Sequence, residues 1–119
     1  MSTSDYSADL LNAALQVVTG PRRQEYGDPE HDLECSGQLM SAWLNRRFGV
    51  TIAITGADVS QLMILHKAAR LAHTPGHHDS WLDQAGYAAC GWRCTAVRAD
   101  QSASSPMTTG TGTVLLTPP

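Results

Sequence analysis

The amino-acid sequence predicts an all-α fold, a compact bundle of four main helices. Apolar residues recur at spacings of three and four along four separate stretches, which is the pattern of helices that bury one face. Two of these stretches open with strong helix-start signals, Asp28-Pro29 and Thr55-Gly-Ala-Asp58. The β-branched run at residues 50–54 is short and has no second strand to pair with, so we read it as a linker.

The bulk composition suits a single folded domain and excludes some partners. The chain has 119 residues, 42% of them hydrophobic, and its net charge of −3 argues against binding to duplex nucleic acid, which usually needs a basic domain. No apolar run approaches the roughly 20 residues that span a bilayer, and the N-terminus does not resemble a signal peptide. We therefore expect a cytoplasmic protein with no membrane partner, whose cysteines (Cys35, Cys90 and Cys94) are reduced thiols.

The first half of the chain is predicted to hold two helices joined by a basic loop. The first helix covers about residues 7–19, with Ser7 as its cap, and residues 20–28 form the loop, a kind of segment that often carries function. The second helix begins at Pro29 and ends at Gly49. Gly37, on the buried face of the second helix, would let a neighbouring backbone come close. The residues expected on the buried faces of these two helices are Leu11, Ala14, Leu15, Val18, Leu33, Gly37, Met40 and Leu44.

The second half is predicted to form a helical hairpin and a tail. A third helix from Thr55 to about His73 is apolar nearly all round, which predicts a buried central helix. A fourth helix starts near Asp79 and ends near Arg98, and residues 99–119 have the Ser, Thr, Gly and Pro content of a disordered tail. We thus predict one helical domain over residues 1–98. The predicted buried face of the fourth helix consists of Trp81, Ala85, Ala88 and Trp92. An adjacent stripe, also at helical spacing, consists of Asp79, Asp83, Tyr87, Cys90 and Cys94.

The hairpin concentrates the residues that could bind a ligand. Lys67 and Arg70 lie three apart near the end of the third helix, and Asp79 and Asp83 lie four apart at the start of the fourth, so each pair shares one helix face. One interpretation is that the cations and the acids simply form salt bridges across the hairpin. The other is that Lys67 and Arg70 bind phosphate while Asp79 and Asp83 orient them or hold Mg²⁺.

Three further residues could complete such a site. Arg23, from the basic loop, adds a third cation, and Tyr26 and Tyr87 could contact a base or a sugar, although half-buried packing is the simpler explanation for either tyrosine alone. A zinc site built from His77, His78 and the two late cysteines fits no known closed-site spacing. The sequence therefore favours a phosphate-bearing ligand over a zinc centre.

Four motifs occur in order over about residues 8–95. They are Arg23-x-x-Tyr26-Gly27-Asp28-Pro29, Ser41-Ala-Trp43, Lys67-x-x-Arg70-Leu71 and His78-Asp79-Ser80-Trp81-x-Asp83-x-x-Gly86-Tyr87-Ala-Ala. Together these motifs resemble an uncharacterised helical family of tailed bacteriophages and prophages. More distantly they resemble the phage nucleotide-modification-associated domain and the MazG-like all-helical nucleoside triphosphate pyrophosphatases.

These resemblances imply a phage-type protein that binds a phosphorylated nucleotide, and we expect it to form a homodimer or a higher homo-oligomer. One version of this function is binding alone, for example to sequester a host nucleotide signal. A second is Mg²⁺-dependent pyrophosphohydrolysis or nucleotide modification, but the Glu-Glu-x-x-Glu and Glu-x-x-Asp metal motifs of MazG-like enzymes are missing here. A third alternative is a structural or regulatory module that binds another protein.

Overall fold

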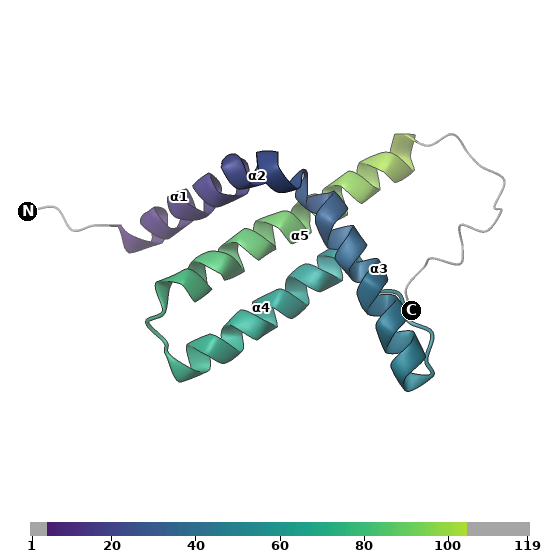
Figure 1. The fold of residues 1–119 in the computed structure, drawn as a ribbon. Helices are drawn as coiled ribbons and strands as arrows, with labels where there is room; N and C mark the ends of the chain where they lie inside the picture. Colours follow the sequence, from purple (N-terminus) through teal and green to yellow (C-terminus); the bar gives the residue numbers. More distant parts are fainter. Residues whose placement is uncertain (1–4, 105–119) are drawn as a thin grey trace, which may run out of the picture.

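The computed structural model describes residues 5–104 of the chain, and within this range it contains helices and no strand (Figure 1). The predicted all-α class with four main helices is therefore confirmed. The basic loop is in part a short additional helix, which follows Gly20 directly because proline is favoured at a first helical position. The helices are α1 (Tyr6–Thr19), α2 (Pro21–Tyr26), α3 (Pro29–Phe48), α4 (Gly56–His73) and α5 (His78–Ser104).

The helix ends follow the local sequence closely. Thr55 and Asp58 form the expected capping box at the start of α4, each side chain accepting a hydrogen bond from the other's backbone N–H. Asp5, rather than the predicted Ser7, caps α1 by accepting a hydrogen bond from the N–H of Ala8. The linker after α3 has no regular secondary structure, and the side chain of Asn45 holds it by accepting from the N–H of Ile52 and donating to its carbonyl.

Three of the helices form one layer, which a fourth helix crosses. Figure 1 shows α5 between α1 and α4, with α4 and α5 joined as an antiparallel hairpin and α3 lying across one end of them. Close approaches hold the parts together: Gly37 of α3 lies against the backbone of Ile54, and Gly91 of α5 lies against Ser60 of α4. The predicted role of Gly37, to admit a neighbouring backbone, is confirmed.

The core is small and lies where α3, α4 and α5 meet. Leu33, Val59 and Cys94 form its buried centre, one residue from each helix. The prediction that the helix at residues 56–73 is buried on nearly all sides is wrong for this chain, since Leu62 and Leu65 are exposed. Helix α4 lies at the edge of the layer and has neighbours on only part of its surface, so half of its apolar residues face outward.

The apolar faces predicted for the first and last helices are also largely exposed. Trp81 and Trp92 of α5 are 48% and 70% exposed, and Leu11 and Leu15 of α1 are exposed as well, although Ala14 is buried. The side of α5 that faces α3 and the core, called its inner side below, instead carries the other predicted stripe. This stripe ends at the buried Cys94. The reason is that its charged residues find partners inward, on α3 and α4.

The C-terminal boundary differs from the predicted one. Helix α5 continues past residue 98 to Ser104, so the first residues of the predicted tail are helical. The rest of that tail, from residue 105, lies outside the described residues. Within residues 5–104, no helix combines the length and the hydropathy needed to cross a membrane.

Candidate functional site

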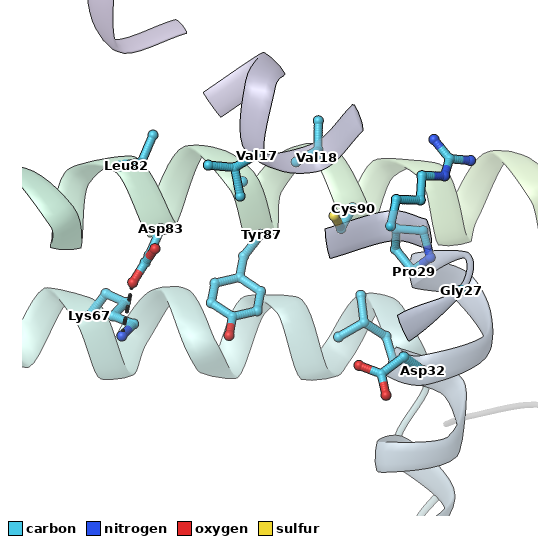
Figure 2. Close-up of a pocket in the computed structure, with 13 residues that line it drawn as sticks. Val17, Val18, Gly27, Pro29, Asp32, Lys67, Leu82, Asp83, Tyr87 and Cys90 are labelled. Carbon is cyan, nitrogen blue, oxygen red and sulfur yellow. Dashed lines mark ion pairs between the residues drawn. The ribbon is translucent and has the colours of Figure 1, made fainter. Parts of the chain in front are cut away.

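A cavity of about 480 Å³ lies along the inner side of α5, between α1 and α4 (Figure 2). Its size is within the range of about 300–1,000 Å³ that is typical of small-molecule sites. Apolar side chains form part of the wall: Val17, Val18, Pro29, Leu33 and Leu82. Polar and ionisable side chains form the rest: Arg23, Asp32, Lys67, Asp83, Tyr87 and Cys90. The cavity therefore combines an apolar surface with a few polar groups, as ligand sites usually do.

The hairpin contributes one ion pair to this cavity. The ammonium of Lys67 lies 3.1 Å from Oδ2 of Asp83, and the Lys67 side chain is only 13% exposed. This bond fixes the position of both groups and joins α4 to α5 beside the open space, as Figure 2 shows. An ammonium has three N–H donors, so one contact with a carboxylate leaves it able to donate to an anionic ligand. The structure thus contains both the predicted salt bridge and a cavity next to it.

Arg23 brings the second cation to the cavity wall. Its Nε donates to Oδ1 of Asp28 at 3.1 Å, so the contact uses one edge of the guanidinium. The terminal N–H groups of an arginine form a planar fork that suits phosphate oxygens. Because α2 and the Gly27 turn place Arg23 between α1 and α3, its charge reaches a cavity whose other cation comes from α4.

Tyr87 provides the aromatic part of the wall. The side chain is half-buried on α5, and Figure 2 shows its ring between the Lys67–Asp83 pair and Asp32. A ring in this position can stack on a planar ligand, and its hydroxyl can donate to or accept from a sugar. Tyr87 therefore lies where the sequence prediction requires, one helical turn from Asp83.

The sequence reasoning missed Asp32, an exposed carboxylate in the first turn of α3 that also lines the cavity. Acids in the first turn of a helix are already expected from the helix dipole, so the residue type alone does not mark Asp32 as part of a site. The available signal was spacing: Asp32 follows Pro29 by three residues, so the two share the helix face that meets the cavity.

Two of the predicted site residues do not line the cavity, and the side chain of a third is not described. Arg70 is exposed and does not line the cavity, and neither does Asp79, whose carboxylate lies 3.6 Å from the ring of His78 at the surface. Tyr26 ends α2, and its side chain lies outside the part of the chain that the structure describes. The two predicted pairs on the hairpin thus reduce to one cation and one acid, Lys67 and Asp83.

The described residues contain no group of three or more His, Cys, Asp or Glu side chains that could hold a metal ion. Asp79 and Asp83 therefore gain no third ligand, and His77 bonds to the hydroxyl of Ser80 at 2.7 Å rather than meeting a cysteine. Burial raises the pKa of Cys94 to about 11 and also raises the pKa of Cys90. Both thiols stay protonated at neutral pH, which makes them poor nucleophiles and poor metal ligands.

A second set of charges joins α3 to α5 beyond the cavity. Glu30 is nearly buried and accepts two hydrogen bonds from Arg93, at 2.6 and 3.1 Å. These bonds lower the pKa of the Glu30 carboxyl, and a weaker pair, Arg98 with Glu34, lies one turn further along. Since Glu30 is buried and both of its oxygens are used by Arg93, we assign it to holding the helices together.

The chain matches a family model and is similar to proteins of two bacteriophages. The family model described as Domain of unknown function (DUF6378) matches residues 9–95, a range that includes every described residue of the cavity wall. The Gene 55 protein of Mycobacterium phage D29 is 37% identical over 84 residues, which cover 71% of this chain and 52% of that protein. The Gene 55 protein of Mycobacterium phage L5 is 35% identical over 79 residues, covering 66% of this chain and 47% of that protein.

The chain spans about half the length of these curated relatives. No solved structure shows significant similarity to it. The comparisons therefore define the family and its occurrence in bacteriophages, and any chemistry has to be argued from the cavity itself.

Proposed function

The chain belongs to the DUF6378 family, which has members in bacteriophages, and we propose that it binds a phosphorylated nucleotide in the cavity beside α5. The observation that supports this proposal is the meeting of Lys67, Arg23 and Tyr87, from three different segments, around one space of about 480 Å³. Cations suit phosphate oxygens, and an aromatic ring suits a base.

The charges already present set how such a ligand would bind. Lys67 and Arg23 are paired with Asp83 and Asp28, and the wall also includes the carboxylate of Asp32, so the cavity has no net positive charge before binding. A phosphate would take up the unused donors of both cations without displacing Asp83 or Asp28. The apolar residues Val17 and Leu82 would cover the base or the sugar. This arrangement predicts modest affinity that falls as salt concentration rises.

Binding without chemical turnover is the version that the carboxylates favour. Asp32 and Asp83 line the cavity on different helices, but the described residues offer no third acid to complete a metal cluster. Mg²⁺-dependent cleavage of a phosphoanhydride usually depends on several carboxylate ligands around the metal. We therefore propose sequestration of the nucleotide, with release of the intact ligand.

The test is a thermal-shift screen of the purified chain against linear and cyclic nucleotides, each with and without Mg²⁺. We expect at least one nucleotide to raise the melting temperature without metal, and the ligand recovered from the complex to be unchanged. Turnover that requires Mg²⁺ and is lost in Asp83→Asn would instead identify an enzyme. If no nucleotide changes the melting temperature, the proposal is wrong.

Two variants on α4 supply a matched comparison. Lys67 and Arg70 are cations three residues apart, and only Lys67 lines the cavity. The nucleotide should stabilise Arg70→Ala as it does the unchanged chain, but not Lys67→Met. Because Lys67→Met leaves Asp83 without its partner, the double variant Lys67→Met/Asp83→Asn is the control for folding. Equal loss of binding in Arg70→Ala would place the ligand elsewhere on α4.

A further inference from the structure

Among residues 5–104, no helix covers one apolar side of α5, which faces away from the cavity. Successive residues on a helix are rotated by about 100°. With Asp83 and Cys90 on the cavity side, the residues on the opposite side are Trp81, Ala85, Ala88 and Trp92, which we call the tryptophan stripe. No charged residue falls within this stripe, although surface helices normally carry their charges on the exposed side.

The two tryptophans of the stripe expose apolar surface. Trp92 is 70% exposed, and Trp81 is 48% exposed with its indole N–H already donating to the carbonyl of Pro75 at 2.8 Å. That bond satisfies the only polar group of Trp81 and fixes its ring at the end of the hairpin. An exposed apolar surface of this kind is typical of an interface.

The spacing within the stripe favours a second copy of this chain as the partner. The order is tryptophan, alanine, alanine, tryptophan at intervals of four, three and four residues, and it reads the same in both directions. Such four-three spacing is that of a coiled-coil seam. When a second α5 lies antiparallel across it, Trp81 of one copy meets Trp92 of the other and Ala85 meets Ala88. The small alanines at the centre allow the two helices to approach closely.

We propose that two copies of this chain associate through the tryptophan stripe, with their α5 helices antiparallel around a two-fold axis. Each copy offers the same surface to the other, as a closed dimer requires. An aromatic side chain buries about 150–250 Å² at most, so two tryptophans supply only part of the roughly 800 Å² per partner of a standard interface.

The exposed leucines of the neighbouring helices can supply the remaining area. Leu11 and Leu15 of α1 and Leu65 of α4 are all exposed, and none of the three lines the cavity. The interface would thus extend over the outer surface of the whole layer and leave both cavities open. Dimer formation and ligand binding are therefore independent of each other.

Sedimentation equilibrium of the full chain tests the proposal, with two tryptophans as a matched pair. Trp92 in the stripe is 70% exposed, and Trp43 on α3, outside it, is 62% exposed. We expect the unchanged chain and Trp43→Glu to have twice the 12.8 kDa mass of one chain, and Trp92→Glu to be monomeric with unchanged helical circular dichroism. Ala88→Arg, at the centre of the stripe, should give the same monomer.

Each other outcome overturns the proposal. A monomeric unchanged chain at high concentration does so, and if that monomer floats with anionic lipid vesicles, the stripe meets a membrane surface instead. Dissociation by Trp43→Glu with a dimeric Trp92→Glu moves the interface to α3. A dimer that survives both Trp92→Glu and Ala88→Arg shows that the stripe does not hold the copies together.

Discussion

The inner and outer sides of α5 differ in both chemistry and surroundings. The inner side carries Asp83, which pairs with Lys67, and ends at Cys94 in the core. The outer side carries Trp81 and Trp92 and no charged residue, yet within residues 5–104 no other helix covers it. On α5, the charged residues therefore lie on the side that packs against the rest of the chain, and the large apolar residues lie on the exposed side.

This placement, the reverse of the usual apolar interior and charged surface, has a simple physical cause. A single layer of three helices with one crossing helix cannot cover both sides of its central helix. The crossing helix α3 lies on the inner side, where its acids reach Arg93, and the cavity remains beside it. The inner side is thus specified by hydrogen bonds and ion pairs, while the outer side retains the apolar residues that drive association.

The strongest way to break this comparison is to place the same charge on both sides of α5. Cys94 is 3% exposed in the core, so Cys94→Asp buries an unpaired carboxylate and should cost about 4 kcal/mol or more of folding free energy. Ala88→Asp, on the outer side, should cost no more than about 1 kcal/mol in the monomer. Urea denaturation at a concentration where the chain is monomeric measures both. Similar losses would show that the two sides are equally buried.

The inner side should also depend on pH through Glu30. Arg93 holds the pKa of this carboxyl below its ordinary value of 4.5, so the stabilisation is complete above that pH and is lost as the pH falls through the lower folded-state pKa. Glu30→Gln should cost about 2 kcal/mol at pH 7 and flatten the loss of stability between neutral and acidic pH. Melting curves across this range provide the measurement. An unchanged acid dependence in Glu30→Gln would assign it to other carboxylates.

Adding one methyl group at either of two glycines of α5 tests how closely its two surroundings are packed. A Cβ on Gly91 would lie 2.7 Å from Cβ of Ser60, whereas on Gly86 it would meet only Val18, at an ordinary 3.8 Å. Gly91→Ala should therefore destabilise the chain by at least about 1 kcal/mol, and Gly86→Ala should stabilise it by up to about 1 kcal/mol through helix propensity. Chemical denaturation of both variants decides this. Stabilisation by both would mean that α4 and α5 are less closely packed.

The smallest expected effect concerns a buried hydroxyl on α4. Ser60 is fully buried, and its Oγ is the one buried side-chain oxygen or nitrogen of the described residues without a hydrogen-bond partner. An unpaired buried hydroxyl is unfavourable, so Ser60→Ala should raise the free energy of unfolding by about 1 kcal/mol. A lower stability in Ser60→Ala would indicate that a bound water satisfies the hydroxyl.

Local signals in the sequence predicted the helices well. The capping box at Thr55, the Pro29 start and the backbone approach at Gly37 depend on neighbouring residues or on one close contact, and the structure has all three. Which face of a helix is buried depends on what lies beside it, and periodicity alone does not show that. Two faces of α5 had a helical repeat, and we chose the more apolar one, with Trp92, as the inner face.

The candidate site was predictable only in part, because residue types and local spacing can be read from the sequence but contacts between distant helices cannot. Lys67, Asp83 and Tyr87 were identified because their types and spacing fit a hairpin that faces a ligand, and they do line one cavity. Arg70 and Asp79 share a sequence stripe with them but extend beyond the cavity, which ends before the last turn of the hairpin. Contacts between helices far apart in sequence, such as Glu30 with Arg93, gave no local signal.

The central claim is that Lys67 presents phosphate-binding donors to the cavity while paired with Asp83. Calorimetric titration with the nucleotide that most raises the melting temperature tests it directly, on the unchanged chain and on Lys67→Met/Asp83→Asn. We predict one saturable site per chain that weakens at least tenfold in the double variant, whose melting temperature without ligand stays close to that of the unchanged chain. Saturable binding of equal strength in both proteins would contradict the claim and place the nucleotide outside this cavity.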